Sequence, residues 1–352
     1  MYKVKSFSVF IFLSMLISIF TGIRLPDVGR DTEAYIEYFH DSSIDDGFYD
    51  RFEPGFSLLM QLLSKAGLSV EVFFTCVAFI ITVTYLYIFK RTYKHCFLDK
   101  NPSTSIITIF FSLLLFSSWY IASTTNGLRQ GLALVFLYLS LLEFFYNSHK
   151  LKFVFLFVIA TLFHYSSILI LPFLALHYLR FRFVFIIWVL VGLGFALGVN
   201  ELGVKLISET FGLPIYEYVK YYSLEKGSEE LGGGMYEGFI TSFFIYTILW
   251  PLILLFVLKV KTPIKEKMIN TENVYILLKI YFSLSLVYFV MGFGPFSNRY
   301  ALFSWMLVPI MQIVIFRLSI RLQTEKIIPL FFLFSSLVFF LYLRLDWIRF
   351  IK

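Results

Sequence analysis

The chain has 352 residues, of which 59% are hydrophobic and only 15% are charged, whereas soluble domains hold about 45–50% apolar and about 25% charged residues. About ten or eleven membrane-spanning helices of about 20 residues each would use most of the chain, which excludes a soluble catalytic domain, a Rossmann unit and a disulfide-rich scaffold. The net charge of +7 is expected from residues that fix membrane orientation, so no nucleic-acid partner is predicted.

We predict an all-α polytopic membrane protein that forms a single integral membrane domain over residues 1–352, with about eleven transmembrane helices and no soluble domain. The first apolar run, from Ser6 to Ile23, is longer than a signal-peptide core, so we expect it to remain as the first span. The other apolar runs predict spans near 70–89, 104–121, 130–146, 183–199, 237–258, 273–293, 300–316 and 327–343.

The stretch 152–179 is apolar except near its centre, which contains His164. It is long for one spanning helix and short for two complete ones. Lysines flank one end and arginines flank the other, so both ends are expected to face the same compartment. We therefore predict two short helices that meet at His164.

Charged residues are sorted by loop. Segment 24–52 holds eight acids against three arginines, and segment 200–236 holds six acids against three lysines. By contrast, 90–100 and 259–272 are rich in lysine. Because cytoplasmic loops collect lysine and arginine, 24–52 and 200–236 are predicted to be extracytoplasmic loops.

The loops fall on their predicted sides of the membrane only if 53–68 does not cross it. The stretch has about 11 apolar-rich residues after Pro54, which is too few to span, and proline suits the first turn of a helix. We predict a half-helix at the outer face, with the N-terminus of the chain in the cytoplasm.

Polar side chains at membrane depth are costly, so those near the ends of spans are candidates for function. Guanidinium groups match phosphate oxygens in pairs, and an acid or a histidine could serve as a base. Arg129 and Arg299 also have the wrong sign for an outer flank. We expect the catalytic candidates to share the outer face, where they suit an anionic lipid-linked substrate, and they are Asp31, Glu53, Arg129, His164 and Arg299.

Each candidate has a purely structural alternative. Arg129 and Arg299 could mark span ends by snorkelling, and His164 could hydrogen-bond a carbonyl at a helix break. Asp31 could be one solvated acid among several, and Glu53 could be a helix-start residue. No metal-ligand motif or Cys/His cluster occurs in the sequence, so no metal and no other cofactor is expected.

Five short motifs follow one another along most of the chain, and they are Arg30-Asp31-Thr32-x-x-Tyr35, Glu53-Pro54-Gly55-Phe56, Leu128-Arg129-Gln130-Gly131-Leu132-Ala133, Phe163-His164-Tyr165-Ser166-Ser167 and Asn298-Arg299-Tyr300. In this order they resemble the EpsG-like branch of the Wzy-type bacterial polysaccharide polymerases. The resemblance implies a multi-pass protein of the bacterial cytoplasmic (inner) membrane. Such a protein joins undecaprenyl-diphosphate-linked oligosaccharide units into O-antigen, capsule or exopolysaccharide, with flippase and chain-length regulator proteins as partners. The outer loop 200–236 is short for this family.

The resemblance also implies roles for the candidates in a glycosyl transfer that uses no nucleotide sugar. Arg129 and Arg299 would neutralise the departing diphosphate. Asp31 or Glu53 would take the acceptor proton, with His164 as the rival base. The substrate-binding residues would be Arg30, Tyr35, Gln130, Asn298 and Tyr300.

Three alternatives stay open. An O-antigen ligase would transfer the finished chain to another acceptor at the same face. A lipid-linked oligosaccharide flippase or another transporter should hold ionisable residues at mid-bilayer, whereas here they cluster at the outer ends. A membrane acyltransferase could use His164, but no second catalytic pairing accompanies that residue.

Overall fold

The computed structural model describes residues 2–29, 31–41, 52–99, 101–221, 238–259, 269–294 and 296–319. The regular elements in these ranges are all helices. The chain divides into two compact units, the first made of Met1–Ile168 and Ser319–Lys352 and the second of Leu169–Leu318. Arg30, the predicted span 327–343 and much of both predicted outer loops lie outside the described residues.

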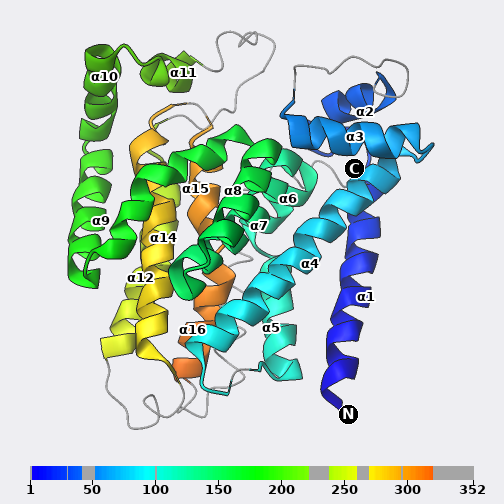
Figure 1. Ribbon diagram of the computed structural model, residues 1–352, viewed down its shortest axis with the longest axis horizontal. Helices are drawn as coiled ribbons and strands as arrows, with labels where there is room; N and C mark the ends of the chain where they lie inside the picture. The colour runs from blue at the N-terminus through cyan, green and yellow to red at the C-terminus, as the bar shows by residue number, and fades with distance from the viewer. Residues whose placement is uncertain are drawn as a thin grey trace. The chain divides into compact units, whose positions relative to one another are not determined.

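The first unit is a set of helices packed around α4. Its elements are α1 (Tyr2–Gly22), α2 (Thr32–Asp41), α3 (Pro54–Lys65), α4 (Val70–Cys96), α5 (Thr104–Leu115), α6 (Ser118–Thr125), α7 (Leu128–Leu142), the π-helix η1 (Glu143–Asn147) and α8 (Lys150–Phe163). Helix α4 packs against both α1 and α7, and α7 packs along α8 (Figure 1). Ring contacts also join α4 to α5, such as the stacked rings of Phe89 and Phe110, whose centroids are 3.8 Å apart.

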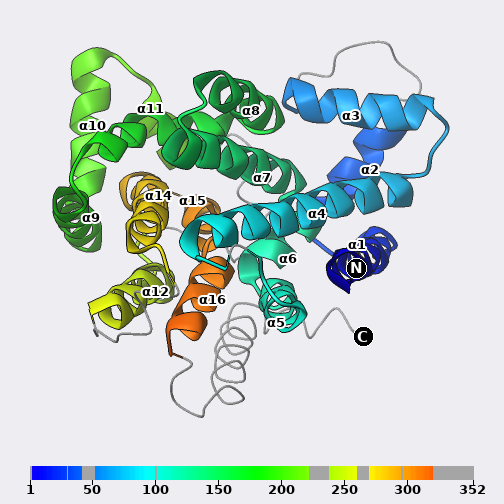
Figure 2. The ribbon, with the colours of Figure 1, turned by 60° about the horizontal axis from the view of Figure 1, so that its bottom comes forward.

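Helix α3 begins at Pro54, directly after Glu53, whose carbonyl accepts from the amides of Phe56 and Ser57 at 3.0 Å each. The fixed φ of proline suits this first turn. Both ribbon views show α3 running across the direction of α1 rather than alongside it (Figures 1 and 2). The predicted short helix is therefore present, while its position at the outer face of a membrane stays a prediction.

The stretch 152–179 is broken at His164, as the sequence predicts. Helix α8 ends at Phe163, and a 3₁₀-helix, η2 (Tyr165–Tyr178), begins directly after the break. His164 itself has extended backbone angles, φ −161° and ψ 116°. His164 therefore lies between the two helices and belongs to neither α8 nor η2.

The second unit begins with most of η2. It continues with α9 (Phe181–Ala196), α10 (Val199–Phe211), α11 (Ile215–Tyr221), α12 (Thr241–Lys259), α14 (Thr271–Met291), α15 (Ser297–Trp305) and α16 (Val308–Ser319). Helices α9 and α14 pack together, and the indole of Trp188 donates to Ser285 at 2.7 Å. Lys279 of α14 donates to the carbonyls of His177 and Leu179 at 3.1 and 2.6 Å, which satisfies the end of η2.

Five helices in the described ranges are long and apolar enough to cross a membrane, or up to seven if each of two bent pairs forms one span. The predicted total of eleven spans stays a prediction. The run 104–121 is not one straight helix, because the pair bends by 63° near Ser117, which adopts an extended cap conformation. The predicted loop 200–236 also contains helix, since α10 continues from α9 after a bend of 94°.

The close approach of α3 to α8 depends on Gly55. A Cβ atom at this position would lie 2.9 Å from the backbone oxygen of Leu162. We expect Gly55→Ala to destabilise the protein by about 1–3 kcal/mol, because the backbone of one helix must move. Gly203→Ala in α10 is the matched control, since a Cβ there meets nothing within 4 Å. Thermal unfolding midpoints in detergent should fall only for Gly55→Ala, and equal midpoints for the two variants would contradict this.

Candidate active site

Glu53 is the centre of a charged network in the first unit. Nη1 of Arg129 donates to its Oε2 at 2.6 Å, and Nδ1 of His164 lies 2.5 Å from its Oε1. Glu53 is only 5% exposed. A buried carboxylate needs opposite charge and hydrogen bonds to stay ionised, and here each oxygen has one such partner.

Three helix ends bring these side chains together. Glu53 precedes α3, Arg129 is the second residue of α7, and His164 follows the last residue of α8. Helix α7 approaches α6 closely at Gly131, where a Cβ would lie 2.6 Å from the carbonyl oxygen of Ser123. The two glycines, Gly55 and Gly131, therefore set the helix spacing that the network requires.

Tyr35 and Asp31 lie beside the network. The Tyr35 hydroxyl donates to the carbonyl of Asn126 at 3.4 Å, and its side chain also forms a hydrogen bond with Arg129. The amide of Asp31 donates to Oδ1 of Asn126 at 3.1 Å. Asn126 thus ties the start of α2 to the junction between α6 and α7, three residues before Arg129.

The guanidinium of Arg129 also lies over an aromatic ring. Its Cζ is 4.7 Å from the ring centroid of Phe52, the residue before Glu53. This cation–π contact and the ion pair to Glu53 hold the guanidinium in one place. Gln130, the next residue of α7, is buried. Nε of Arg129 has no hydrogen-bond partner in the described part of the chain.

The charge of Glu53 is set by competing effects. Burial would raise the pKa of Glu53, but the hydrogen bond and charge of His164 and the charge of Arg129 outweigh it and lower that pKa to about 2. An ionised carboxylate can only accept hydrogen bonds, so Nδ1 of His164 carries the hydrogen. The second ring nitrogen of His164 is then the atom that exchanges protons. A carboxylate with so low a pKa is a weak base, and its geometry suits orienting the imidazole.

The remaining candidates, Asn298, Arg299 and Tyr300, belong to the first turn of α15 in the second unit. Phe296, directly before this helix, has a left-handed backbone conformation with φ 60°, which is uncommon for a non-glycine residue. The Cζ of Arg299 lies 4.5 Å from the ring centroid of Phe296. Oδ1 of Asn298 is buried and has no hydrogen-bond partner among the described residues.

The structure thus brings together four predicted residues, Tyr35, Glu53, Arg129 and His164, with the backbone of Asp31 close by. Sequence reasoning did not identify Phe52 or Asn126, although Asn126 stands three residues before Arg129. A signal for Asn126 was present, since a polar residue at a helix junction often satisfies backbone groups. Among the described residues, no group of three or more His, Cys, Asp or Glu side chains could hold a metal ion.

Several long apolar helices and a buried charged network at helix ends define a multi-pass membrane protein with a candidate active site. The chain belongs to the EpsG family, whose sequence pattern it matches over residues 7–350. This family is associated with polysaccharide polymerase activity. No curated protein and no solved structure matches the chain.

The low pKa of Glu53 gives a pH dependence of stability. A carboxylate whose pKa falls from 4.5 to about 2 on folding stabilises the folded state above pH 4.5, and that contribution is lost as the pH falls towards 2. We expect Glu53→Gln to unfold at lower temperature than the wild type at pH 7, with the difference shrinking between pH 4.5 and 2. Thermal midpoints of both proteins across this range test this. A difference independent of pH would contradict it.

Proposed function

We propose that the protein polymerises undecaprenyl-diphosphate-linked oligosaccharide units into a surface polysaccharide. The reaction is a glycosyl transfer at the extracytoplasmic face of the bacterial inner membrane. Two findings support this proposal, the membership of the EpsG family and the network of Glu53, Arg129 and His164. The network is the main support for the proposal, because a cation and an oriented imidazole lie side by side at helix ends.

In the proposed step, a hydroxyl oxygen of the acceptor sugar attacks the anomeric carbon of the donor. The bond from that carbon to the diphosphate oxygen breaks, and the diphosphate leaves with the electron pair on its lipid carrier. The hydroxyl proton passes to the second ring nitrogen of His164. Glu53 holds the imidazole through Nδ1 and stabilises its charged form, the division of roles that a carboxylate–histidine pair supports.

Arg129 is the proposed partner of the departing diphosphate. Its Nη1 is engaged by Glu53, while Nε has no hydrogen-bond partner in the described part of the chain. Charge-assisted hydrogen bonds from a held guanidinium favour an anion that gains charge in the transition state. Tyr35 and Gln130 lie beside Arg129 and are proposed to contact the substrate. Arg30, which lies outside the described residues, keeps the same proposed role.

Substitutions in the network should separate these roles. We expect His164→Ala to lower the rate of polymerisation by about 10²–10⁴-fold, because the imidazole that accepts the proton is removed. Glu53→Gln should lower the rate and change its pH profile, because it alters how the imidazole is held and charged. Polymer length and initial rate, measured on purified lipid-linked units between pH 5 and 9, provide the test. A His164→Ala protein with a wild-type rate and pH profile would eliminate His164 as the base.

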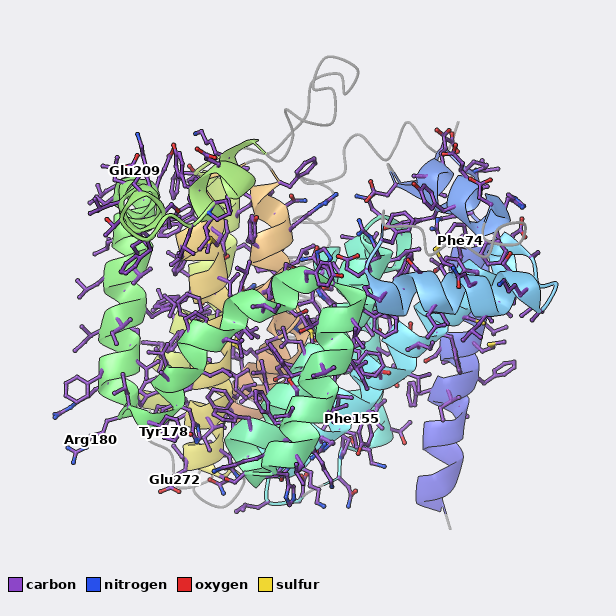
Figure 3. All side chains as sticks on the ribbon, turned by 45° about the horizontal axis from the view of Figure 1, so that its top comes forward. Phe74, Phe155, Tyr178, Arg180, Glu209 and Glu272 are labelled. Carbon is purple, nitrogen blue, oxygen red and sulfur yellow. The ribbon has the colours of Figure 1, made fainter. Side chains whose placement is uncertain are left out.

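Arg299 is proposed to bind anionic groups of the substrate independently. We expect Arg299→Ala to reduce polymer assembly by about 10²–10³-fold if it stabilises developing charge. Arg180→Ala is the control, since Arg180 is exposed and points away from the helices (Figure 3). Immunoblots of cell-surface polysaccharide, normalised to membrane levels of each variant, compare the two. Full-length polymer in cells that carry Arg299→Ala would remove this role.

The lipid-linked sugars of a deletion strain distinguish the proposed function from its alternatives. Single units that reach the outer face but are not joined indicate a polymerase. Units that stay on the inner face indicate a flippase, and complete free polymer that is not attached to its final acceptor indicates a ligase. Full polymer that lacks acetyl groups indicates an acyltransferase, and each of these last three outcomes would overturn the proposal.

A further inference from the structure

Arg24 differs from the other described arginines of the first unit. Arg91 donates to Glu143 at 2.6 Å, and Arg129 donates to Glu53 at the same distance. Arg24 contacts no carboxylate in the part of the chain that the structure describes. It is a half-buried cation whose charge has no acidic partner there. Such a charge is costly to the folded state.

Arg24 is nevertheless held in one place. Its Nη1 donates to the carbonyl of Thr21 at 3.1 Å, and its Nε donates to Oγ1 of Thr32 at 3.4 Å. The Cζ lies 3.9 Å from the ring centroid of Phe74, a residue near the start of α4. The third nitrogen, Nη2, is buried and has no hydrogen-bond partner among the described residues. These two hydrogen bonds and the ring contact hold the guanidinium in place, and Nη2 is left as a donor without a described acceptor.

Tyr35 connects Arg24 to the network around Glu53. Its side chain interacts electrostatically with both Arg24 and Arg129, and it is 1% exposed. Thr32, the acceptor of the Arg24 Nε hydrogen bond, lies three residues before Tyr35 on α2. Both guanidinium groups have an unused donor among the described residues, Nη2 on Arg24 and Nε on Arg129. Burial lowers the pKa of Arg24 to about 10, against an opposing effect of Tyr35. Arg24 remains charged at neutral pH even so.

We propose that Arg24 and Arg129 together bind a phosphate-ester anion beside Tyr35. Paired guanidinium groups are the side chains best matched to phosphate oxygens, and the anion would supply both the missing charge and the missing acceptors. The nature of the ligand rests on the proposed function, under which it is the diphosphate of a lipid-linked substrate. An anionic phospholipid headgroup carries the same phosphate-ester chemistry, and competition between the two ligands distinguishes them.

A purely structural role accounts poorly for Arg24. Packing on Phe74 needs only an unbranched apolar side chain such as methionine, which carries no charge to desolvate. A snorkelling arginine would place its terminal nitrogens in solvent, whereas Nη2 is buried. The arrangement costs stability in the free protein and is explained by a ligand that offsets this cost.

The stability of the ligand-free protein gives the first test. Arg24→Met should leave the thermal midpoint in detergent unchanged or raise it, because an uncompensated charge is removed and the ring contact is kept. Arg91→Met is the matched comparison and should lower the midpoint, because it leaves the buried Glu143 without its ion-pair partner. An Arg24→Met midpoint that falls as far as that of Arg91→Met would assign Arg24 a structural role and overturn the proposal.

Binding of inorganic diphosphate to the purified protein gives the second test. Arg24→Met and Arg24→Gln should weaken binding about 10- to 100-fold, as expected for the loss of a charge-assisted hydrogen bond. Arg180→Met, at an exposed position, should bind as the wild type does. Undiminished binding by both Arg24 variants, or no binding by the wild type, would overturn the proposal.

Competition then identifies the source of the phosphate. Displacement of inorganic diphosphate by undecaprenyl diphosphate indicates the substrate, and displacement by nanodiscs of phosphatidylglycerol indicates a membrane lipid. The polymerisation assay separates the two proposals. If binding depends on Arg24 but the protein makes no polymer, the phosphate site is supported and the proposed function is rejected. If Arg24→Met polymerises normally and with an unchanged dependence on donor concentration, the proposed function is supported and the role of Arg24 in phosphate binding is rejected.

Discussion

Glu53 is a buried carboxylate held between an arginine and a histidine from two other helices, and the rest of the first unit is arranged around this requirement. Each of its oxygens has one partner, Arg129 at 2.6 Å and His164 at 2.5 Å. Removing either partner leaves an ionised oxygen without compensation in a poorly solvated place. Helices α3, α7 and α8 therefore cannot move apart without exposing or orphaning a charge. The ion pair fixes where three helix ends meet.

That meeting point depends on backbone approach as much as on charge. Gly55 lets α3 reach the carbonyl of Leu162 on α8, and Gly131 lets α7 reach Ser123 on α6. Asn126 then hydrogen-bonds the backbone of Asp31, so the start of α2 follows the same junction. Contacts of this kind raise the precision of a site, because they lie on helix ends that packing already holds. The same residues that form the fold thus determine the distances in the network.

The sequence predicted a large part of this arrangement. The break at His164 followed from a polar centre in an apolar stretch, and Arg129 stood out because its sign opposed the sorting of charges. The sequence left open whether Asp31 or Glu53 was the relevant acid, since Glu53 pairs with residues 76 and 111 positions away, and no local period encodes such contacts. Arg24 was inconspicuous for a related reason. Within an acidic loop it is one of three arginines among eight acids, and only packing shows that none of the described acids contacts it.

The distribution of charge around Tyr35 has a consequence for the proposed reaction. Of the two arginines that interact with Tyr35, only Arg129 is ion-paired with a described carboxylate, so Arg24, Arg129 and Glu53 together carry an excess of positive charge. In the proposed reaction, a bound diphosphate would offset this excess before the chemical step begins. During glycosyl transfer, negative charge grows on the departing diphosphate while a proton moves to His164, so the two changes have opposite sign within one poorly solvated region. Coulombic attraction is strong at short range in such a region, and charges that develop together there stabilise each other. In the proposed reaction, the proximity of Arg129 and His164 on the two oxygens of Glu53 would therefore couple departure of the leaving group to removal of the acceptor proton.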